Sequence, residues 1–374
     1  MKILQICNFS SGISGVWTRV LEDSREFIKR GYEVHVFSSD QQENTEKALS
    51  TQEIKDVGLN RGIDLTRFPV RKQAGYALWF DFEEAALKLK PDVIICHGLR
   101  KPYLGLTIKI AKRLGIKCFL ITHAPFIDKE LRTTKLNFII WLYDKFKGKK
   151  IMNSFDKVLA ICKWEKEDLL NLGCEEERIM YLPNSLSDEF FNQEPGIAEK
   201  KILFMGRMHP VKEIELLIEA FKESNLKNYK LEIVSSLTGD YYKKLLGISD
   251  KDVTFTEPIY DLDKKIKKID SAEIFVLPSK KESLPFGLIE AMARGKLVIA
   301  TRTKGALELI INTKNGFLFD IGNKEQLKDW LNTILKMSKE RKNQIKIEAM
   351  KTAAEFKVSI VMEKWGELFK NGRT

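Results

Sequence analysis

The sequence predicts an α/β protein with two doubly wound domains, each built on a parallel sheet with helices on both faces. Three observations support this fold class. The chain has 374 residues, more than one hydrophobic core usually supports. Short β-branched or apolar runs alternate with longer segments of helical period, as in parallel sheets with crossover helices. After a polar segment at residues 185–200, which we interpret as a linker, the same pattern begins again.

The first domain is expected over residues 1–185. Its first strand is 3–7, and the helix 16–30 follows with its apolar residues on one face. Pro91, Gly115 and Gly173 are typical residues for ending the helices that precede them. The other expected elements are strands 33–38, 92–96, 117–122 and 157–161, and helices 102–115 and 163–172.

The second domain is expected over residues 186–355. It begins with strand 201–205 and helix 211–221. Further strands are expected at 230–235, 253–256, 274–278, 297–300 and 316–319, and helices at 324–335, 340–356 and 360–369. We expect residues 356–374 to form a C-terminal helix that crosses back to the first domain.

The composition excludes several classes of protein. An apolar content of 44% with 31% charged residues is typical of a globular core and argues against disorder. No apolar run approaches the ~20 residues that span a bilayer, and the start of the chain does not resemble a signal peptide. The five cysteines include no Cys-x-x-Cys pair, and there are only four histidines. We therefore expect no disulfide framework, no metal site and a cytoplasmic location.

Positive charge is concentrated in one part of the chain. The net charge is +11, and residues 100–150 alone contain thirteen basic and three acidic residues. Such a field indicates an anionic partner, which could be a phosphate ligand, a nucleic acid or a membrane surface. We do not favour nucleic acid, because no reading module is recognisable and the basic stretch has few interleaved aromatic residues.

Within this basic stretch, residues 132–150 read as an apolar helix flanked by lysines. The expected apolar stripe consists of Leu136, Ile139, Ile140, Tyr143 and Phe146, widened by Phe138, Trp141 and Leu142. One interpretation is a helix that lies on an anionic membrane, on the inner face if the protein is cytoplasmic. The other is a domain helix that packs on the sheet with a solvated basic end. The local charge favours the membrane.

The region after strand 274–278 carries the strongest chemical motif. A loop contains Glu282, and Pro285 and Gly287 flank the start of a short helix whose first amides could bind an anion. Glu290, eight residues after Glu282, is expected in the first helical turn. Both carboxylates could accept hydrogen bonds from sugar or ribose hydroxyls. The spacing alone fits a solvated loop glutamate and a helix-dipole glutamate even better.

Other strand ends carry further candidate residues. Gly206 permits a tight turn after strand 201–205. Arg207 and Lys212, in the loop that follows, suit a diphosphate. The alternative is that both are ordinary surface cations. The loop 10–15 lacks the three-glycine spacing of a dinucleotide site. His97 and His123 both follow strands, and we interpret His97 as structural.

In chain order, these segments resemble family 4 of the retaining glycosyltransferases (glycosyl transferases group 1). The resemblance covers most of the chain. It is carried by Lys90-Pro91-Asp92-Val93-Ile94 before His97, Ile121-Thr122-His123, Leu182-Pro183-Asn184-Ser185, Gly206-Arg207 with Lys212, Glu282 to Glu290, and Gly305-Ala306-Leu307-Glu308 with Asn315-Gly316. The chain departs from the family pattern at Ser14, Ser185, Glu213 and Ala306. The family has the GT-B fold, in which two Rossmann-like domains face each other across a cleft.

The resemblance implies a role for each matching residue. Arg207 and Lys212 would bind the donor diphosphate and stabilise it as it leaves. Glu290 would hold the ribose, Glu282 the donor sugar, and His123 would contact the transferred sugar near the acceptor. The other implied donor-binding residues are Gly15, Gly206, Pro258, Ile259, Phe286, Gly287 and Leu288.

The resemblance also implies the reaction. A hexose-type sugar would pass from a UDP- or GDP-sugar to a glycan or lipid-linked acceptor, with retention, without a protein nucleophile, and without metal or other cofactor. The alternative is a nucleotide-sugar epimerase or phosphorylase on the same fold. No lysine is recognisably placed for a pyridoxal Schiff base, and the two glutamates favour transfer.

Overall fold

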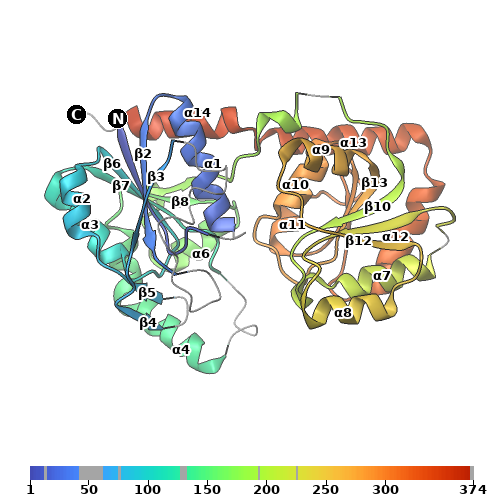
Figure 1. Ribbon diagram of the computed structural model, residues 1–374, viewed down its shortest axis with the longest axis horizontal. Coiled ribbons are helices and arrows are strands. Elements are labelled where there is room, and N and C mark those ends of the chain that lie inside the picture. The colour runs from blue at the N-terminus through green and yellow to red at the C-terminus, as the bar shows by residue number, and fades with distance from the viewer. Residues whose placement is uncertain are drawn as a thin grey trace. The chain divides into compact units, whose positions relative to one another are not determined.

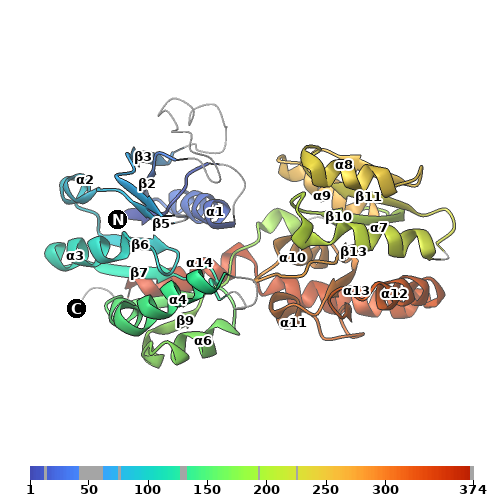
Figure 2. The same cartoon turned by 90° about the horizontal axis from the view of Figure 1, so that it is seen from below.

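The computed structural model describes residues 1–11, 15–41, 62–74, 77–126, 133–192, 194–224 and 226–370 (Figures 1 and 2). The chain divides into an N-terminal unit, Met1–Ser185 with Val361–Thr374, and a C-terminal unit, Leu186–Ile360. The main sheet of each unit is parallel and covered by helices, so the predicted α/β class is confirmed.

The N-terminal unit is built on a sheet with the strand order β3-β2-β1-β6-β7-β8-β9, in which every pair is parallel. The strands are β1 (Lys2–Ile6), β2 (Glu33–Ser39), β3 (Asp64–Phe68), β6 (Val93–His97), β7 (Lys117–Ile121), β8 (Lys157–Ala160) and β9 (Ile179–Tyr181). The helices are α1 (Gly15–Lys29), α2 (Glu83–Leu89), α3 (Leu104–Leu114), α4 (Thr134–Tyr143), α5 (Lys149–Met152) and α6 (Glu165–Asn171). A separate antiparallel pair is formed by β4 (Lys72–Ala74) and β5 (Ala77–Trp79).

Both faces of this sheet are buried. Because side chains alternate along a strand, Leu4 and Ile6 of β1 pack with α2 and α3 on one face, while Gln5 points to α1 on the other. The aromatic rings of Trp365 and Phe369 in α14 (Val358–Lys370) pack against Phe27 of α1 and Phe119 of β7. The last helix is thereby part of the core of the N-terminal unit.

The C-terminal unit has a sheet with the order β12-β11-β10-β13-β14-β15, again all parallel. The strands are β10 (Glu199–Met205), β11 (Lys230–Val234), β12 (Val253–Thr256), β13 (Ala272–Leu277), β14 (Leu297–Thr301) and β15 (Phe317–Phe319). The helices are α7 (Ile214–Glu223), α8 (Gly239–Ile248), α9 (Leu262–Asp270), α10 (Phe286–Ala293), α11 (Lys304–Leu309), α12 (Lys324–Lys336) and α13 (Lys339–Ala354). Within this unit, α10 packs on α13 and α7 on α12.

The segment that we predicted as a linker is instead held on the C-terminal unit. The buried Arg294 guanidinium donates hydrogen bonds to the carbonyls of Phe190 and Glu194, and Phe190 is itself buried. Leu186 pairs with Lys357 in an isolated bridge. The polar composition of this segment favoured a linker. Its partner Arg294 lies about a hundred residues further along the chain, so the local sequence gives no sign of the contact.

Two predicted helices are interrupted. The helix expected at 211–221 begins only at Ile214, because Glu213 has a positive φ of 45° that ends a short 3-10 turn, Pro210–Lys212. The helix expected at 132–150 is divided into α4, a π-helical turn (Asp144–Gly148) and α5. Arg132, the first residue of that prediction, lies outside the described residues.

Candidate functional site

The carboxyl edge of the C-terminal sheet gathers most of the predicted donor residues. Gly206 and Arg207 follow β10, Pro258 and Ile259 follow β12, and Glu282 lies in the loop after β13. Since these strands are parallel and adjacent or nearly so, their ends meet at one edge, where α/β sheets usually bind ligands.

The two predicted phosphate-binding cations differ in their surroundings. Lys212 forms an ion pair with Glu282, with 2.5 Å between Nζ and Oε1, and both side chains are only 12–13% exposed. Arg207 is exposed and has no hydrogen bond or ion pair with any described residue. The site therefore holds one cation that is already neutralised and one that is free.

The helix α10 begins at Phe286, directly after Pro285. Glu290 therefore lies in the second turn of the helix, and the prediction of the first turn was wrong. Glu290 is buried and forms an ion pair with Lys265 of α9. Lys265 could not be singled out from the sequence, because it lies in a run of similar lysines, 264–268, with no local mark.

Gly305 fixes the loop that carries Glu282. A Cβ at Gly305 would lie 2.4 Å from the carbonyl oxygen of Ser283 and 2.9 Å from Cδ of Pro285, which no side chain could tolerate. In return, the amide of Gly305 donates a hydrogen bond to the carbonyl of Glu282, at 3.0 Å. The glycine at this position is thus required by the close approach of α11 to the loop.

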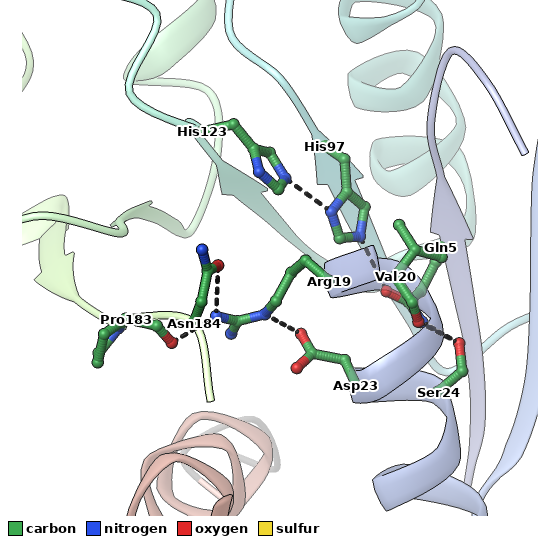
Figure 3. A network of polar contacts seen from close by, with 9 residues as sticks. All are labelled: Gln5, Arg19, Val20, Asp23, Ser24, His97, His123, Pro183 and Asn184. Carbon is green, nitrogen blue, oxygen red and sulfur yellow. Dashed lines mark hydrogen bonds and ion pairs between the residues drawn. The ribbon is translucent and has the colours of Figure 1, made fainter. Parts of the chain in front are cut away.

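A second polar cluster lies in the N-terminal unit and contains the predicted residue His123 (Figure 3). Nε2 of His123 lies 3.0 Å from Nδ1 of His97, and Nε2 of His97 lies 2.8 Å from Oε1 of Gln5. Nε2 of Gln5 in turn contacts Oγ of Ser24 on α1, at 2.6 Å. Gln5 was not among the predicted site residues, although a polar residue within the apolar run 3–7 was a signal for this cluster.

Both histidines in this cluster are held neutral. Burial, followed by the charges of Arg19 and Lys101, lowers the pKa of His123 to about 3. Burial also holds the pKa of His97 well below its usual range, with further contributions from His123 and Arg19. The cluster therefore works through hydrogen bonds rather than through charge.

Glu165 holds the backbone on which His123 lies. His123 and Ala124 have positive φ values of 58° and 47°, a region that costs a residue other than glycine about 1–3 kcal/mol. The buried Glu165 carboxylate accepts hydrogen bonds from the Thr122 hydroxyl and the Ala124 amide on this turn. It also accepts from the amides of Ile161 and Cys162, at 2.8 and 2.9 Å. Burial raises the pKa of Glu165 to about 7, although these hydrogen bonds oppose the rise.

The remaining N-terminal motifs have structural partners. Arg19, fully buried on α1, pairs with Asp23 at 2.6 Å and donates to Oδ1 of Asn184, which explains the Pro-Asn motif (Figure 3). Gly15 opens α1 and is exposed, while residues 12–14 of its loop lie outside the described residues. Gly15 and His123 belong to the N-terminal unit, whereas the other predicted site residues belong to the C-terminal unit.

An exposed apolar surface covers α4 and the turn after it. We call it the α4 patch, and its members are Leu136, Phe138, Ile139, Trp141 and Phe146, which are 45–69% exposed. No residue of α4 is fully buried, although Ile140, Leu142 and Tyr143 are half-buried, so α4 is not a core helix of the sheet. The element is attached at its end instead, where the Arg100 guanidinium makes two 2.8 Å hydrogen bonds to Asp144.

Exposed lysines follow this patch in the sequence. Nζ of Lys145 lies 4.8 Å from the centroid of the Trp141 ring, and Lys147, Lys149 and Lys150 follow along the chain, all exposed. Across the described residues, no helix has the length and apolar character needed to cross a bilayer. The same residues contain no cluster of three or more His, Cys, Asp or Glu side chains suited to a metal ion.

Comparison with known proteins matches both halves of the chain. The sequence family described as "Glycosyltransferase Family 4" matches residues 13–190, and the one described as "Glycosyl transferases group 1" matches residues 187–350. An uncharacterized glycosyltransferase of Methanocaldococcus jannaschii is 24% identical over 334 residues, 84% of each chain. The chain belongs to glycosyltransferase family 4.

Further relatives agree with this assignment. An N,N'-diacetylbacillosaminyl-diphospho-undecaprenol α-1,3-N-acetylgalactosaminyltransferase of Campylobacter jejuni is 29% identical over 104 residues, 28% of this chain and 27% of that protein. The crystal structure of Alr3699/HepE from Anabaena in complex with UDP superposes with a TM-score of 0.78, at 17% identity, over 99% of this chain and 100% of that one. The fold is therefore GT-B, as the resemblance implied.

The neutral histidines of this glycosyltransferase predict an acid-sensitive N-terminal unit. The pKa of His123 is about 3 in the folded protein, against its ordinary value of 6.5 in the unfolded chain, so the unfolded chain binds more protons below pH 6.5. The contribution of His123 to the free energy of unfolding is therefore fully present above pH 6.5. It falls as the pH is lowered, by about 2 kcal/mol at pH 5.

The measurement is urea unfolding of the full chain at pH 7 and pH 5, in the wild type and in His123→Asn. Asparagine tolerates the positive φ at this position better than most residues. The variant should lose about 2 kcal/mol less than the wild type between the two pH values. Equal losses in both proteins would contradict the assignment of a neutral His123. His209→Asn, at an exposed histidine of the C-terminal unit, is the control.

Proposed function

We propose that this glycosyltransferase moves a hexose-type sugar from a UDP- or GDP-sugar to a glycan or lipid-linked acceptor, with retention at the anomeric carbon. The observation that carries the donor assignment is the free Arg207 beside the Lys212–Glu282 pair at the carboxyl edge of the C-terminal sheet. A diphosphate would find there an unpaired guanidinium, a lysine and the first amides of α10. The UDP bound by Alr3699/HepE supports a nucleotide donor.

The proposed reaction needs no protein nucleophile. An oxygen of the acceptor hydroxyl bonds to the anomeric carbon on the face from which the diphosphate leaves, and the hydroxyl proton passes to the leaving diphosphate. Arg207 and Lys212 stabilise the negative charge that develops on that group. Glu282 holds hydroxyls of the donor sugar, Glu290 holds those of the ribose, and His123 contacts the transferred sugar near the acceptor.

A donor screen followed by product analysis tests the reaction class. Bound donor should raise the melting temperature, because a ligand of the folded state stabilises it by mass action. The sugar of the product should keep its anomeric configuration, as seen by NMR. An epimer formed without any acceptor would instead favour the alternative, a nucleotide-sugar epimerase.

For the acceptor, we propose a site at an anionic membrane surface on the cytoplasmic side, reached through the α4 patch. The support is the exposed apolar patch together with the lysines that follow it, since apolar area and the attraction of lysines to anionic lipids both contribute to binding at a bilayer surface. The Campylobacter jejuni relative is named for a diphospho-undecaprenol acceptor, which is lipid-linked.

Replacing either donor cation should slow transfer. Arg207→Ala and Lys212→Ala should each lower kcat/KM roughly 100-fold, since one interaction with developing charge contributes about 3 kcal/mol. Arg207→Ala should leave the melting temperature unchanged, because Arg207 is exposed and unpaired. Lys243→Ala, on the exposed surface of the same unit, is the control. Wild-type turnover in both site variants would refute the donor assignment.

Transfer should not require a divalent metal. In the proposed site the positive charge that a metal would supply comes from Arg207, Lys212 and the start of α10. The initial rate should be the same with and without excess EDTA. A rate that falls on chelation and recovers with Mg²⁺ or Mn²⁺ would contradict this.

The chain should bind anionic vesicles in a salt-sensitive manner. Replacing Lys145, Lys147, Lys149 and Lys150 with Glu should abolish sedimentation with phosphatidylglycerol vesicles at low salt, since each basic residue contributes about 1 kcal/mol near such a surface. Donor binding should survive. The charge-matched control replaces the exposed Lys243, Lys244, Lys336 and Lys339.

The apolar part of the α4 patch should be tested separately. Phe138→Ser with Trp141→Ser should weaken vesicle binding even where the lysines remain. If the wild type stays in the supernatant, or if the patch joins two copies of the chain in sedimentation equilibrium, the membrane assignment is wrong.

A further inference from the structure

The hydrogen bonds around His123 fix which of its nitrogen atoms carries a proton. The chain of hydrogen bonds that leads to His123 starts at the carbonyl oxygen of Val20, which can only accept. Nε2 of Gln5 lies 3.3 Å from that oxygen and 2.6 Å from Oγ of Ser24, and the Ser24 hydroxyl itself donates to Val20. The amide group of Gln5 must therefore turn its NH₂ toward α1 and its oxygen toward His97.

The orientation of Gln5 determines the tautomer of His97. Oε1 of Gln5 is an acceptor, so Nε2 of His97, 2.8 Å away, carries a hydrogen atom. His97 is neutral and 1% exposed, so its Nδ1 has a lone pair. That lone pair faces Nε2 of His123 at 3.0 Å and can only accept from it.

We call this chain of hydrogen bonds from Val20 through Gln5 and His97 the relay, and it ends at His123. Its Nε2 carries the hydrogen that His97 accepts, and its neutral ring therefore has an unprotonated Nδ1. No described residue forms a hydrogen bond with this Nδ1. The turn that presents the ring is held by Glu165, so both the position and the protonation of His123 are set before any ligand arrives. Figure 3 shows the relay from α1 across β1 and β6 to His123.

We propose that Gln5 and His97 are positioning residues, which hold His123 as the Nε2–H tautomer so that its bare Nδ1 accepts a hydrogen bond from a hydroxyl group of the sugar. The proposal rests on the proposed contact between His123 and the transferred sugar. It replaces the interpretation of His97 as merely structural. A polar strand residue and a buried histidine thereby act on the reaction without touching the substrate.

A histidine at this position could act as a base or as a hydrogen-bond acceptor, and the relay favours the second role. With a pKa of about 3, His123 is too weak a base to hold a proton at neutral pH. Its Nδ1 can nevertheless orient a hydroxyl by accepting its hydrogen bond. In the opposite tautomer, the ring would present an N–H to the same hydroxyl and select a different orientation.

Nitrogen-15 NMR of histidine-labelled protein tests the tautomers directly. The chain has only four histidines, so single substitutions assign the signals. At pH 7, His97 and His123 should each show a protonated Nε2 and an unprotonated Nδ1. A protonated Nδ1 on His123 in the wild type would overturn the proposal, whatever the activity of the enzyme.

Gln5→Met tests the role of the relay. Methionine has a similar volume but offers no carbonyl, so His123 should become a mixture of tautomers. Transfer should slow roughly 10- to 100-fold, as is typical when a group that orients a functional residue is lost. Melting with added UDP should show unchanged nucleotide affinity. Ser24→Ala tests the orientation of Gln5 itself: because the Val20 carbonyl still accepts from the Gln5 amide, this variant should keep the tautomer of His123.

The outcomes separate this proposal from the proposed function. A tautomer mixture in Gln5→Met with wild-type turnover would refute the positioning role while leaving transfer intact. If the wild type shows the expected tautomers but catalyses no transfer, the relay geometry stands and the sugar contact is refuted. If Gln5→Met fails to fold, the wild-type spectrum and Ser24→Ala still decide the tautomer.

Discussion

The N-terminal site depends on one buried carboxylate, Glu165, that forms no ion pair with any residue the structure describes. Glu165 is satisfied by four hydrogen-bond donors, and these come from the end of β7 and the end of β8. It therefore joins two neighbouring strand ends and helps to hold the left-handed backbone at His123, although its burial raises its pKa to about 7. Without these hydrogen bonds, the positive φ at His123, which places its ring next to His97, would lose its support.

The sheets could be predicted from the sequence because their central strands are apolar on both faces, as parallel strands between helices must be. The edges could not. Only Leu65 is buried among the five residues of β3, and none of β4 is, so neither has an apolar signal. The helix α9 was also missed, because most of its residues are charged. Its lysines look solvated in the sequence, although Lys265 pairs with the buried Glu290 in the structure.

The candidate site could be predicted only where a motif is local. Glu282, Gly206, Arg207 and Lys212 were found because they follow strands, and parallel strands place such residues at one edge. Glu290 was found by its spacing of eight residues from Glu282. The partners that control them come from far along the chain. Gln5 meets His97 across 92 residues, and Glu165 meets Thr122 across 43. Pairing of this kind has no period and no spacing, so one sequence cannot reveal it.

Under the proposed function, the two units would bind a polar ligand by opposite means. His97 and His123 are neutral, and only Nδ1 of His123 needs a hydroxyl to complete the hydrogen bonds of the pair. In the C-terminal unit, by contrast, Lys212 and Glu282 are already joined, and so are Lys265 and Glu290. A diphosphate bound as proposed would have to compete with Glu282 for Lys212, so that lysine would contribute only the difference between two charged partners. Among the described residues Arg207 has no partner to leave, and its attraction for such a ligand would be opposed only by loss of hydration and side-chain freedom. The free arginine should therefore contribute more to donor affinity than the lysine, although both carry one charge.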